Sequence, residues 1–139
     1  MSHTHISATL RRKVLERAGG RCEYCGLPVR FSFAAHQIDH VIPEKHGGET
    51  VADNLALSCI LCNKYKGSDL ASIDPKTGMI TPLYNPRTQQ WQLHFLLNEN
   101  GFLVSETAEG RATIRFLQFN RAERIEERRL MRVAGFWEL

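Results

Sequence analysis

The sequence lacks any apolar run that approaches the roughly 20 residues needed to cross a lipid bilayer. Its N-terminal stretch, MSHTHISATLRRK, also lacks the hydrophobic segment of a secretory signal peptide. We therefore expect a cytoplasmic protein without a membrane partner. Internal repeats and low-complexity segments are absent too, and a hydrophobic content of 42% excludes wholesale disorder.

A strong charge of either sign is missing as well, because the formal net charge at pH 7 is only +3. The small basic excess is uneven: residues 1–66 hold nine Lys or Arg against six Asp or Glu, whereas residues 67–139 hold nine of each. Such a chain permits a nucleic-acid partner without proving one. No separate recognition module such as a helix-turn-helix is evident, so nothing in the sequence predicts base-specific reading.

Cysteine is scarce, but the four cysteines form two Cys-x-x-Cys pairs, Cys22/Cys25 and Cys59/Cys62, with 33 residues between the pairs. In a reducing compartment such pairs are more often metal ligands than disulfides. Four thiolates favour a closed, structural zinc site with no position left open for chemistry. The alternative is two unrelated pairs of free or redox-active thiols, which would suit a redox or zinc-sensing protein.

An amphipathic helix is predicted over about Ala8–Ala18, with Ser7 as its N-cap and Gly19 at its end. The polar face of this helix is basic. That face is either an ordinary solvated surface or a surface that contacts phosphates. Its basic residues are Arg11, Arg12, Lys13 and Arg17.

A hairpin is predicted next. Residues Phe31–Ile42 have strand character, and a return strand begins at Thr50–Val51 after a proline- and glycine-containing turn. Asn54 then opens a short connection that is irregular or forms one helical turn. A further helix is expected from Asn63 onward.

The composition changes after Ile73, where three of the five prolines fall within DPKTGMITPLYNPR. We expect a β-hairpin formed by Trp91–Leu97 and Phe102–Ser105, a helix over Thr107–Leu117, and a final helix capped by Asn120. The arginines of these helices form either a ridge against DNA or a solvated, salt-bridged face. They are Arg111, Arg115, Arg121, Arg124, Arg128 and Arg132.

Residues suited to phosphodiester chemistry lie close to the second cysteine pair. The Asp39 carboxylate and the Asn63 amide are hard oxygen donors that suit Mg²⁺ or Mn²⁺, although Asn63 could instead be the N-cap of its helix. The histidine side chain of His40 can take a proton from an attacking water at neutral pH. Neighbouring strand residues point to opposite faces, so Asp39 and His40 serve one site only if the strand distorts or a helix crosses its end. Asn54 could hold the loop backbone or orient His40.

In order, the chain reads Cys-x-x-Cys, Asp-His-x-x-Pro, Gly-Gly, Asn-Leu and Cys-Asn-x-x-Lys across residues 21–67. This order resembles the HNH (His-Me finger) endonucleases, whose ββα-metal fold is a hairpin and a helix around one divalent cation. The resemblance implies that His40 corresponds to the family's first His and Asn54 to its middle Asn. Asn63 occupies the position of the family's last His. Asp-His…Asn members, such as phage Holliday-junction resolvases, share that Asn, which favours Mg²⁺ or Mn²⁺. The wider chain is similar to small stand-alone bacterial HNH proteins.

Four further residues are candidates for contact with DNA. Lys64 and Lys66 follow the last expected metal ligand on its helix and suit phosphate contacts. His36 is expected on the strand face of His40, where it touches the phosphate or packs as a structural histidine. His46, in the turn, could reach the substrate.

The sequence thus predicts an α+β fold. A zinc-stapled ββα-metal core with an N-terminal helix is expected over residues 1–72, and a C-terminal β-hairpin with two helices, packed on that core, over residues 73–139. The predicted function is hydrolysis of DNA phosphodiesters, with Zn²⁺ as the structural metal and Mg²⁺ or Mn²⁺ as the catalytic metal. The alternative is a non-catalytic, zinc-stapled nucleic-acid-binding or adaptor module. The C-terminal part could also bind a second copy or a protein partner.

Overall fold

The computed structural model describes residues 5–137. This part of the chain is an α+β fold with four α-helices and three antiparallel pairs of short strands. It divides into two compact units: the first runs to Leu70 and includes Asn85–Gln89, and the second comprises Ala71–Tyr84 and the chain from Gln90 onward. Over residues 5–137, none of the helices has the length and hydropathy of a membrane span.

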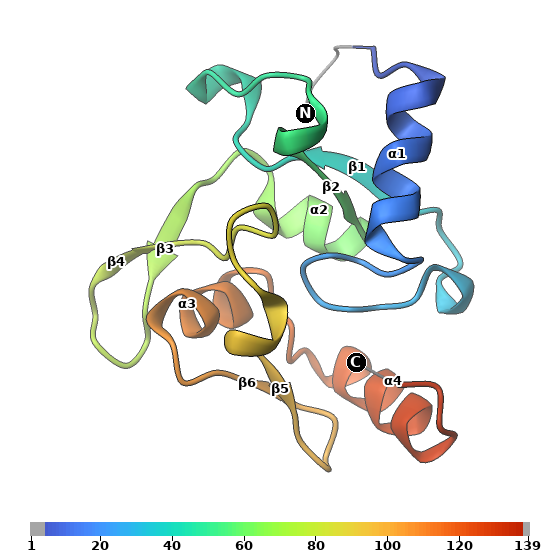
Figure 1. Cartoon of the computed structure of the whole chain (residues 1–139). Coiled ribbons are helices and arrows are strands. Elements are labelled where there is room, and N and C mark those ends of the chain that lie inside the picture. The colour runs from blue at the N-terminus through green and yellow to red at the C-terminus, as the bar shows by residue number, and fades with distance from the viewer. Residues whose placement is uncertain (1–4, 138–139) are drawn as a thin grey trace. The chain divides into compact units, whose positions relative to one another are not determined.

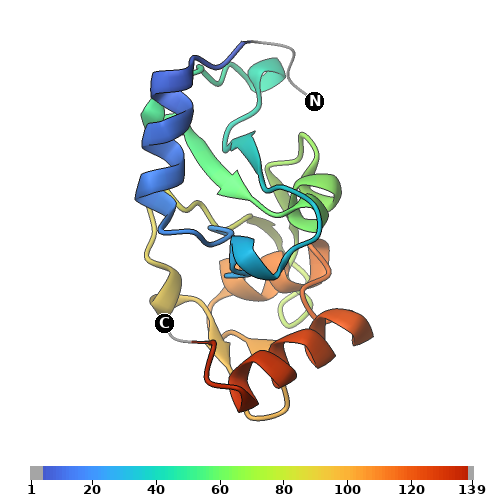
Figure 2. The ribbon, with the colours of Figure 1, turned by 90° about the vertical axis from the view of Figure 1, so that its right-hand side faces the viewer.

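The first unit is built on a β-hairpin that lies between two helices (Figures 1 and 2). Strands β1 (Gln37–His40) and β2 (Leu55–Ser58) pair in antiparallel orientation. Helix α1 (Ala8–Ala18) packs along β2, and the short helix α2 (Ile60–Lys66) packs against β1.

The two faces of this hairpin differ in character. Directly opposite residues of an antiparallel pair point to the same face, and Leu57 lies opposite Ile38. Leu55 and Leu57 are fully buried against Val14 of α1, and Ile38 packs on this cluster. The hydrophobic core of the unit therefore lies on the α1 face, while Asp39 points to the opposite face, where α2 lies.

Helix α1 forms as predicted. The Ser7 hydroxyl accepts a hydrogen bond from a backbone N–H of the first turn at 3.2 Å, and Gly19 ends the helix with φ of 64°. Arg17 is not free on the basic face, because its guanidinium donates to the carbonyl oxygens of Ala52 and Leu55 at 2.9 and 2.6 Å. Arg11, Arg12 and Lys13 are exposed, and Arg17 stays exposed despite these two hydrogen bonds.

Both strands of the first hairpin differ from the prediction. The strand expected over Phe31–Ile42 is paired only from Gln37, because its partner strand ends just before Cys59. The return strand expected at Thr50–Val51 is wrong, since β2 occupies the stretch after Asn54 that we expected to be irregular or helical. All residues of β2 are buried, so the alternation that marks a half-buried strand is missing from its sequence.

The second unit contains two short hairpins and two helices (Figure 1). Its elements are β3 (Ala71–Ile73), β4 (Ile80–Pro82), β5 (Leu96–Leu97), β6 (Leu103–Val104), α3 (Ala108–Phe116) and α4 (Ala122–Val133). The pairing of β5 with β6 and both helices are confirmed. Trp91–Leu93 form a 3₁₀ turn instead of the start of a strand. The β3–β4 hairpin was not predicted, because the prolines of this stretch read as loop signals.

Asn120 does not cap α4, contrary to the prediction. Its side chain instead pairs with the backbone of Leu103 in β6, donating to the carbonyl oxygen at 2.9 Å and accepting from the N–H at 3.0 Å. Arg121 takes the N-cap position of α4 without a side-chain hydrogen bond to the helix. The amide of Asn120 therefore satisfies the backbone N–H and carbonyl oxygen of Leu103. It thereby supports a strand that is too short to be stable alone.

The arginines considered for DNA contact do not form one exposed ridge, although Arg115, Arg121 and Arg132 are exposed. Arg124 and Arg128 are buried and donate to main-chain carbonyl oxygens. Arg111 makes two hydrogen bonds to Asp74 at 2.9 and 2.8 Å, and Arg132 donates to a carbonyl oxygen of β5. These side chains hold the second unit together, because buried carbonyl and carboxylate oxygens need donors.

Candidate functional site

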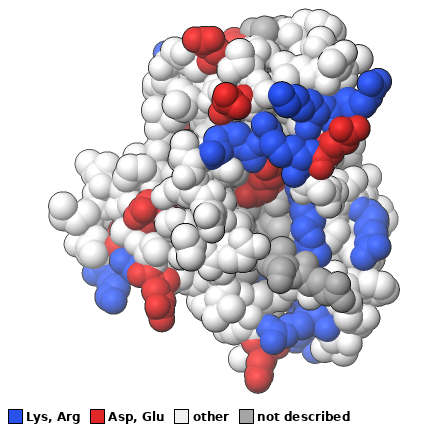
Figure 3. Space-filling view, viewed as in Figure 1, with Lys and Arg blue, Asp and Glu red and all other residues white. Residues whose placement is uncertain are grey.

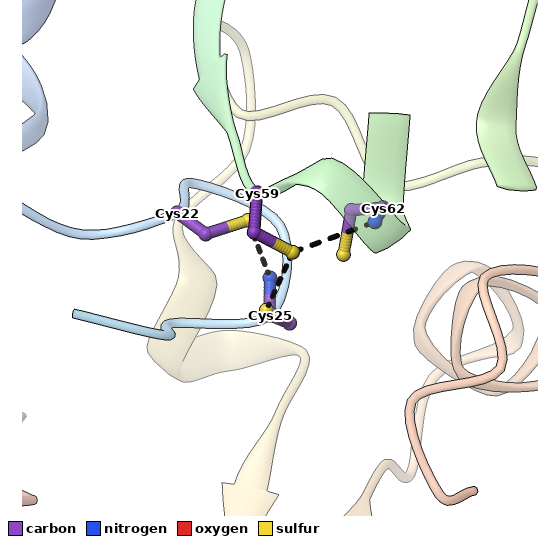
Figure 4. Close-up of side chains that lie close together, drawn as sticks. All are labelled: Cys22, Cys25, Cys59 and Cys62. Carbon is purple, nitrogen blue, oxygen red and sulfur yellow. Dashed lines mark hydrogen bonds between the residues drawn. The ribbon is translucent and has the colours of Figure 1, made fainter. Parts of the chain in front are cut away.

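The four cysteines converge at one point of the first unit (Figure 4). All four are buried, and their sulfur atoms lie within 4.8 Å of one another. The sulfur atoms of Cys25 and Cys59 are 3.7 Å apart. Zn–S bonds of about 2.3 Å in a tetrahedron place two sulfur atoms about 3.8 Å apart. The two pairs therefore form a single cluster that is compatible with a structural zinc ion.

The electrostatics of this cluster also suit a metal. The backbone N–H groups of Cys25 and Cys62 each point at the first sulfur of their own pair, at 3.4 Å. Burial raises the pKa of the Cys22 and Cys62 thiols well above the usual value, and most of their hydrogen bonds with neighbouring thiols add to the rise. Buried thiolates are stable only beside a compensating cation, which zinc would supply.

The cysteine cluster also begins helix α2. Cys59 occupies the N-cap position, and its sulfur accepts the hydrogen bond from the backbone N–H of Cys62. The helix therefore starts at Ile60, three residues earlier than predicted. Asn63 lies inside the helix and is not its N-cap, so its side chain is not used for capping. Because Asn63 follows Cys62 directly, a metal bound by the cysteines would also position Asn63.

Asp39 is a buried carboxylate, with 6% of its surface exposed. Its Oδ2 atom accepts a hydrogen bond from the Tyr24 hydroxyl at 2.7 Å and lies 3.0 Å from the Lys66 ammonium. Burial raises the pKa of Asp39, and the charge of Lys66 and the hydrogen bond from Tyr24 oppose that rise. Burial is the main cause that raises the pKa of Tyr24 well above its usual value, and the negative charge of the neighbouring Asp39 adds to the rise. The phenol therefore stays protonated and donates to the carboxylate.

Helix α2 turns two side chains toward this face of β1. Asn63 and Lys66 are three residues apart and so share a helix face, just as Gln37 and Asp39 share a strand face. The Asn63 amide donates to the side-chain oxygen of Gln37, and the Lys66 ammonium donates to the carbonyl oxygen of His40 at 3.1 Å. Over residues 5–137, the Asn63 amide makes no hydrogen bond to Asp39.

The His40 ring lies among residues of the loop that follows β1. Its Nε2 atom is 2.8 Å from the Thr50 hydroxyl and 3.4 Å from a carboxylate oxygen of Glu44. The Thr50 hydroxyl donates its own proton to Glu44 at 3.3 Å, so it accepts a proton from Nε2–H of His40. That tautomer leaves the lone pair on Nδ1. Strand neighbours point to opposite faces, but His40 is the last residue of β1, and Lys66 of α2 reaches its carbonyl oxygen. Asp39 and His40 can therefore serve one site only across this end of the strand.

Asn54 fixes the backbone of the same loop. Its amide oxygen accepts from the N–H of Ile42, and its amide nitrogen donates to the carbonyl oxygens of Ile42 and Glu49, each at 2.9 Å. Gly48 lies against the carbonyl group of Ile42, so a Cβ added at Gly48 would stand only 1.7 Å from the Ile42 oxygen. Within the described part of the chain, Asn54 makes no hydrogen bond to the His40 ring. It holds the loop backbone, which is the first of the two roles we expected.

The four candidate DNA contacts occupy different surroundings. Lys66 is buried, whereas Lys64 is exposed and lies 5.6 Å from the centre of the next residue's aromatic ring. His46 is exposed, and its Nε2 atom is 3.1 Å from a carbonyl oxygen just after α2. His36 precedes β1, with its Nε2 atom 3.0 Å from the carbonyl oxygen of Leu27. The structure therefore does not gather these four side chains around one point.

The order of these residues along the chain agrees with a match to a known protein family. Residues 22–69 match the model of the HNH endonuclease family. The match covers 48 of the 139 residues of the chain. The HNH match contains the cysteine cluster and the whole of β1, β2 and α2, and it supports a nuclease-type hydrolase that binds nucleic acid. No curated protein sequence matches the chain.

Sequence reasoning missed three residues that surround the HNH site, namely Tyr24, Glu44 and Thr50. Tyr24 lies inside the first Cys-x-x-Cys pair, and an aromatic residue in so short a loop must point either outward or into the site. Glu44 and Thr50 belong to the loop between the strands, where no periodicity indicates the direction of a side chain. Their contacts depend on the loop path that Asn54 and Gly48 impose, which the sequence pattern does not reveal.

Charge on the surface is mixed on the face that Figure 3 shows. Lys and Arg side chains gather in several groups there, with Asp and Glu side chains between them. A field of one sign is therefore not present on this face. We expect affinity for a nucleic acid to depend on a few defined phosphate contacts.

Proposed function

We propose that this chain is a metal-dependent endonuclease that hydrolyses DNA phosphodiester bonds. The observation that carries the proposal is the position of Asp39 and Asn63 on facing sides of β1 and α2, with His40 next to Asp39, inside the HNH segment. A protein that only binds DNA gains nothing from this combination of carboxylate, amide and imidazole. The cysteine cluster supports the proposal because it positions the helix that carries Asn63.

Asp39 and Asn63 each offer one oxygen that fits a divalent cation. Oδ2 of Asp39 is used by Tyr24 and Lys66, which leaves Oδ1. The amide nitrogen of Asn63 donates to Gln37, which leaves the amide oxygen. Two hard oxygen donors suit Mg²⁺ or Mn²⁺, whose shells are completed by water and phosphate oxygens. When bound, such a cation stabilises the charge that develops on the phosphate and on the leaving 3′ oxygen.

His40 is the proposed general base. The Thr50 hydroxyl keeps the ring proton on Nε2, so Nδ1 can accept the proton of the attacking water. Asn54 keeps the loop that carries Thr50 in place. Lys64, Lys66, His36 and His46 are the proposed contacts to DNA.

The remaining proposals concern the organisation of the chain. We propose that residues 1–72 form a ββα-metal nuclease core, and that residues 73–139 bind a second copy or a protein partner. A cluster of four reduced cysteines suits the cytoplasm, where thiols persist. DNA is proposed as the substrate because the HNH resemblance points to it.

A second candidate is a non-catalytic nucleic-acid-binding or adaptor module on the same scaffold. The observation that favours it is the buried pair of Asp39 and Lys66. A buried carboxylate that already has an ammonium and a phenol as partners is satisfied without a metal. Only an assay for cleavage separates this candidate from the nuclease.

The decisive assay is nicking of supercoiled plasmid by the zinc-loaded protein with Mg²⁺ or Mn²⁺, compared with EDTA and with His40→Ala. We expect relaxation of the plasmid that needs the metal and disappears in the variant. His5→Ala is the matched control, because His5 is an exposed histidine that has no role in the proposed site. If the wild type cuts no supercoiled, branched or single-stranded DNA and no RNA, the binding module is the better description.

A further inference from the structure

Lys66 is a buried cation at the centre of the candidate site. Only 2% of its surface is exposed. Its ammonium lies 3.0 Å from Oδ2 of Asp39, donates to the carbonyl oxygen of His40 at 3.1 Å, and stands 6.0 Å from the centre of the Tyr24 ring. An ammonium with these partners cannot contact a phosphate at the same time.

The contact between Lys66 and Asp39 matters because both are placed by the elements that form the site. Asp39 is the carboxylate that we propose as a ligand of the divalent cation, and Lys66 lies one helical turn after Asn63, the second proposed ligand. A divalent cation on Asp39 would stand within a few ångströms of the ammonium. Like charges so close, in a site with little water, repel strongly.

We propose that Lys66 is a counter-ion that Asp39 exchanges for the divalent cation, and that the released ammonium then binds the substrate phosphate. This inference rests on the proposed nuclease function. In the free protein the single charges of Asp39 and Lys66 cancel, so the site attracts a divalent cation only weakly. A phosphodiester brings a negative charge that both cations can share. Cation and DNA therefore bind cooperatively, each raising the affinity for the other by the same factor.

The exchange explains how a lysine suited to phosphate contact is buried in the free protein. It also predicts that the affinity for the divalent cation rises when the Lys66 charge is removed, because Lys66 then no longer competes for Asp39. A phosphate contact alone predicts no change in cation affinity when DNA is absent. A purely structural ion pair predicts damage to the fold when Lys66 is replaced.

The test is binding of Mn²⁺ to the zinc-loaded protein without DNA, followed by electron paramagnetic resonance of free Mn²⁺. We expect Lys66→Met and Lys66→Gln to bind Mn²⁺ at least tenfold more tightly than the wild type. Gln keeps a hydrogen-bond donor for Asp39 and guards against loss of the fold in the Met variant. Lys64→Met is the matched control, because it removes the same charge from an exposed position on α2 and should change the affinity far less.

A second measurement uses the intact wild-type chain. Acetic anhydride should label exposed Lys64 readily and buried Lys66 poorly, and saturating Mn²⁺ should raise the labelling of Lys66 relative to Lys64. Unchanged Mn²⁺ affinity in both Lys66 variants, or an unchanged labelling ratio, would overturn the exchange. If Asp39→Asn still weakens Mn²⁺ binding in that case, the proposed metal site stands. If neither the wild type nor any variant binds Mn²⁺ outside the cysteine cluster, the metal site itself is wrong, and the exchange falls with it.

Discussion

The sulfur atoms of Cys25 and Cys59 lie 3.7 Å apart, although 33 residues separate them in the chain. Cys59 is also the N-cap of α2, the helix that carries Asn63 and Lys66 over Asp39. A metal at the cysteine cluster therefore joins the N-terminal loop to the helix of the candidate site. The position of the proposed cation ligand would then depend on a metal that takes no direct part in the proposed chemistry.

Replacement of one cysteine should remove zinc and structure together. We expect Cys59→Ser to lose the metal and the cooperative unfolding transition of the first unit, because three thiolates bind zinc poorly and the helix also loses its sulfur cap. Metal analysis and thermal circular dichroism measure the two effects on one sample. A zinc-free Cys59→Ser protein that melts like the wild type would refute a structural role for the cluster.

The partners of Asp39 decide which substitution tests its role cleanly. Asp39→Ala leaves the buried ammonium of Lys66 unpaired, and breaking a buried ion pair in this way costs about 3–5 kcal/mol. Asp39→Asn keeps an oxygen that accepts from Tyr24 and Lys66, so we expect a smaller loss of stability. Both variants should lose cation-dependent cleavage, because an amide is a weaker ligand than a carboxylate.

Urea denaturation and plasmid nicking on the same two variants separate stability from activity. The free energy of unfolding should fall further for Ala than for Asn, while cleavage is lost in both. Asp69→Asn is a suitable control, since Asp69 is an exposed carboxylate of the HNH segment that has no role in the proposed site. Cleavage by Asp39→Asn at the wild-type rate would show that Asp39 is only the partner of Lys66.

The HNH match could be predicted from the sequence because it depends on residue order. Asp39, His40, Asn54 and Asn63 were predicted as site residues from their chemistry and from the resemblance to HNH endonucleases, and their roles remain predictions. The positions and burial of the side chains around them could not be predicted from the sequence. Lys66 resembled a surface lysine suited to phosphate, and the short helix α2 gives no amphipathic pattern from which its burial could be inferred.

The same limit explains the errors in secondary structure. Burial on both faces removed the alternation from β2, so its residues gave no strand signal. Asn120 was a reasonable helix cap by residue type, but β6 offered its amide two backbone partners. Tertiary contacts of this kind override local preference and are invisible in a window of sequence.

The Thr50 hydroxyl is expected to govern the tautomer of His40. Thr50→Val keeps the shape of the side chain but removes the acceptor for Nε2–H, so the ring proton can move to Nδ1. We expect cleavage to fall by up to about 100-fold, as for other losses of orientation at a reacting group. Thr50→Ser should restore most of the rate, because Ser keeps the hydroxyl.

Nitrogen-15 NMR of the His40 ring provides a readout that does not depend on activity. The wild type and Thr50→Ser should show the Nε2–H tautomer, and Thr50→Val should show a larger share of Nδ1–H. An unchanged tautomer in Thr50→Val would mean that Glu44, which lies 3.4 Å from the same nitrogen, holds the proton alone.

Asp74 makes the second unit sensitive to acid. Its carboxylate is fully buried and accepts from Arg111, from the backbone of Lys76 at 3.0 Å and from the Thr77 hydroxyl at 3.0 Å. The hydrogen bonds from Arg111 are the largest cause that holds the pKa of Asp74 well below its usual range. A carboxylate whose pKa is lowered by folding stabilises the folded state at any pH above its unfolded value of about 3.9. That stabilisation is lost as the pH falls from there toward the lowered pKa.

We therefore expect the melting temperature of the wild type to fall steeply below about pH 4. Asp74→Asn should melt at a lower temperature at pH 7 and show a flatter decline in acid, since it has no proton to take up at this position. Glu126→Gln is the matched control: an Arg129 partner also lowers the pKa of Glu126, but the pair is exposed and contributes little. Thermal denaturation of the three proteins between pH 2 and pH 7 gives the comparison. Equal acid slopes for the wild type and Asp74→Asn would show that other carboxylates control unfolding in acid.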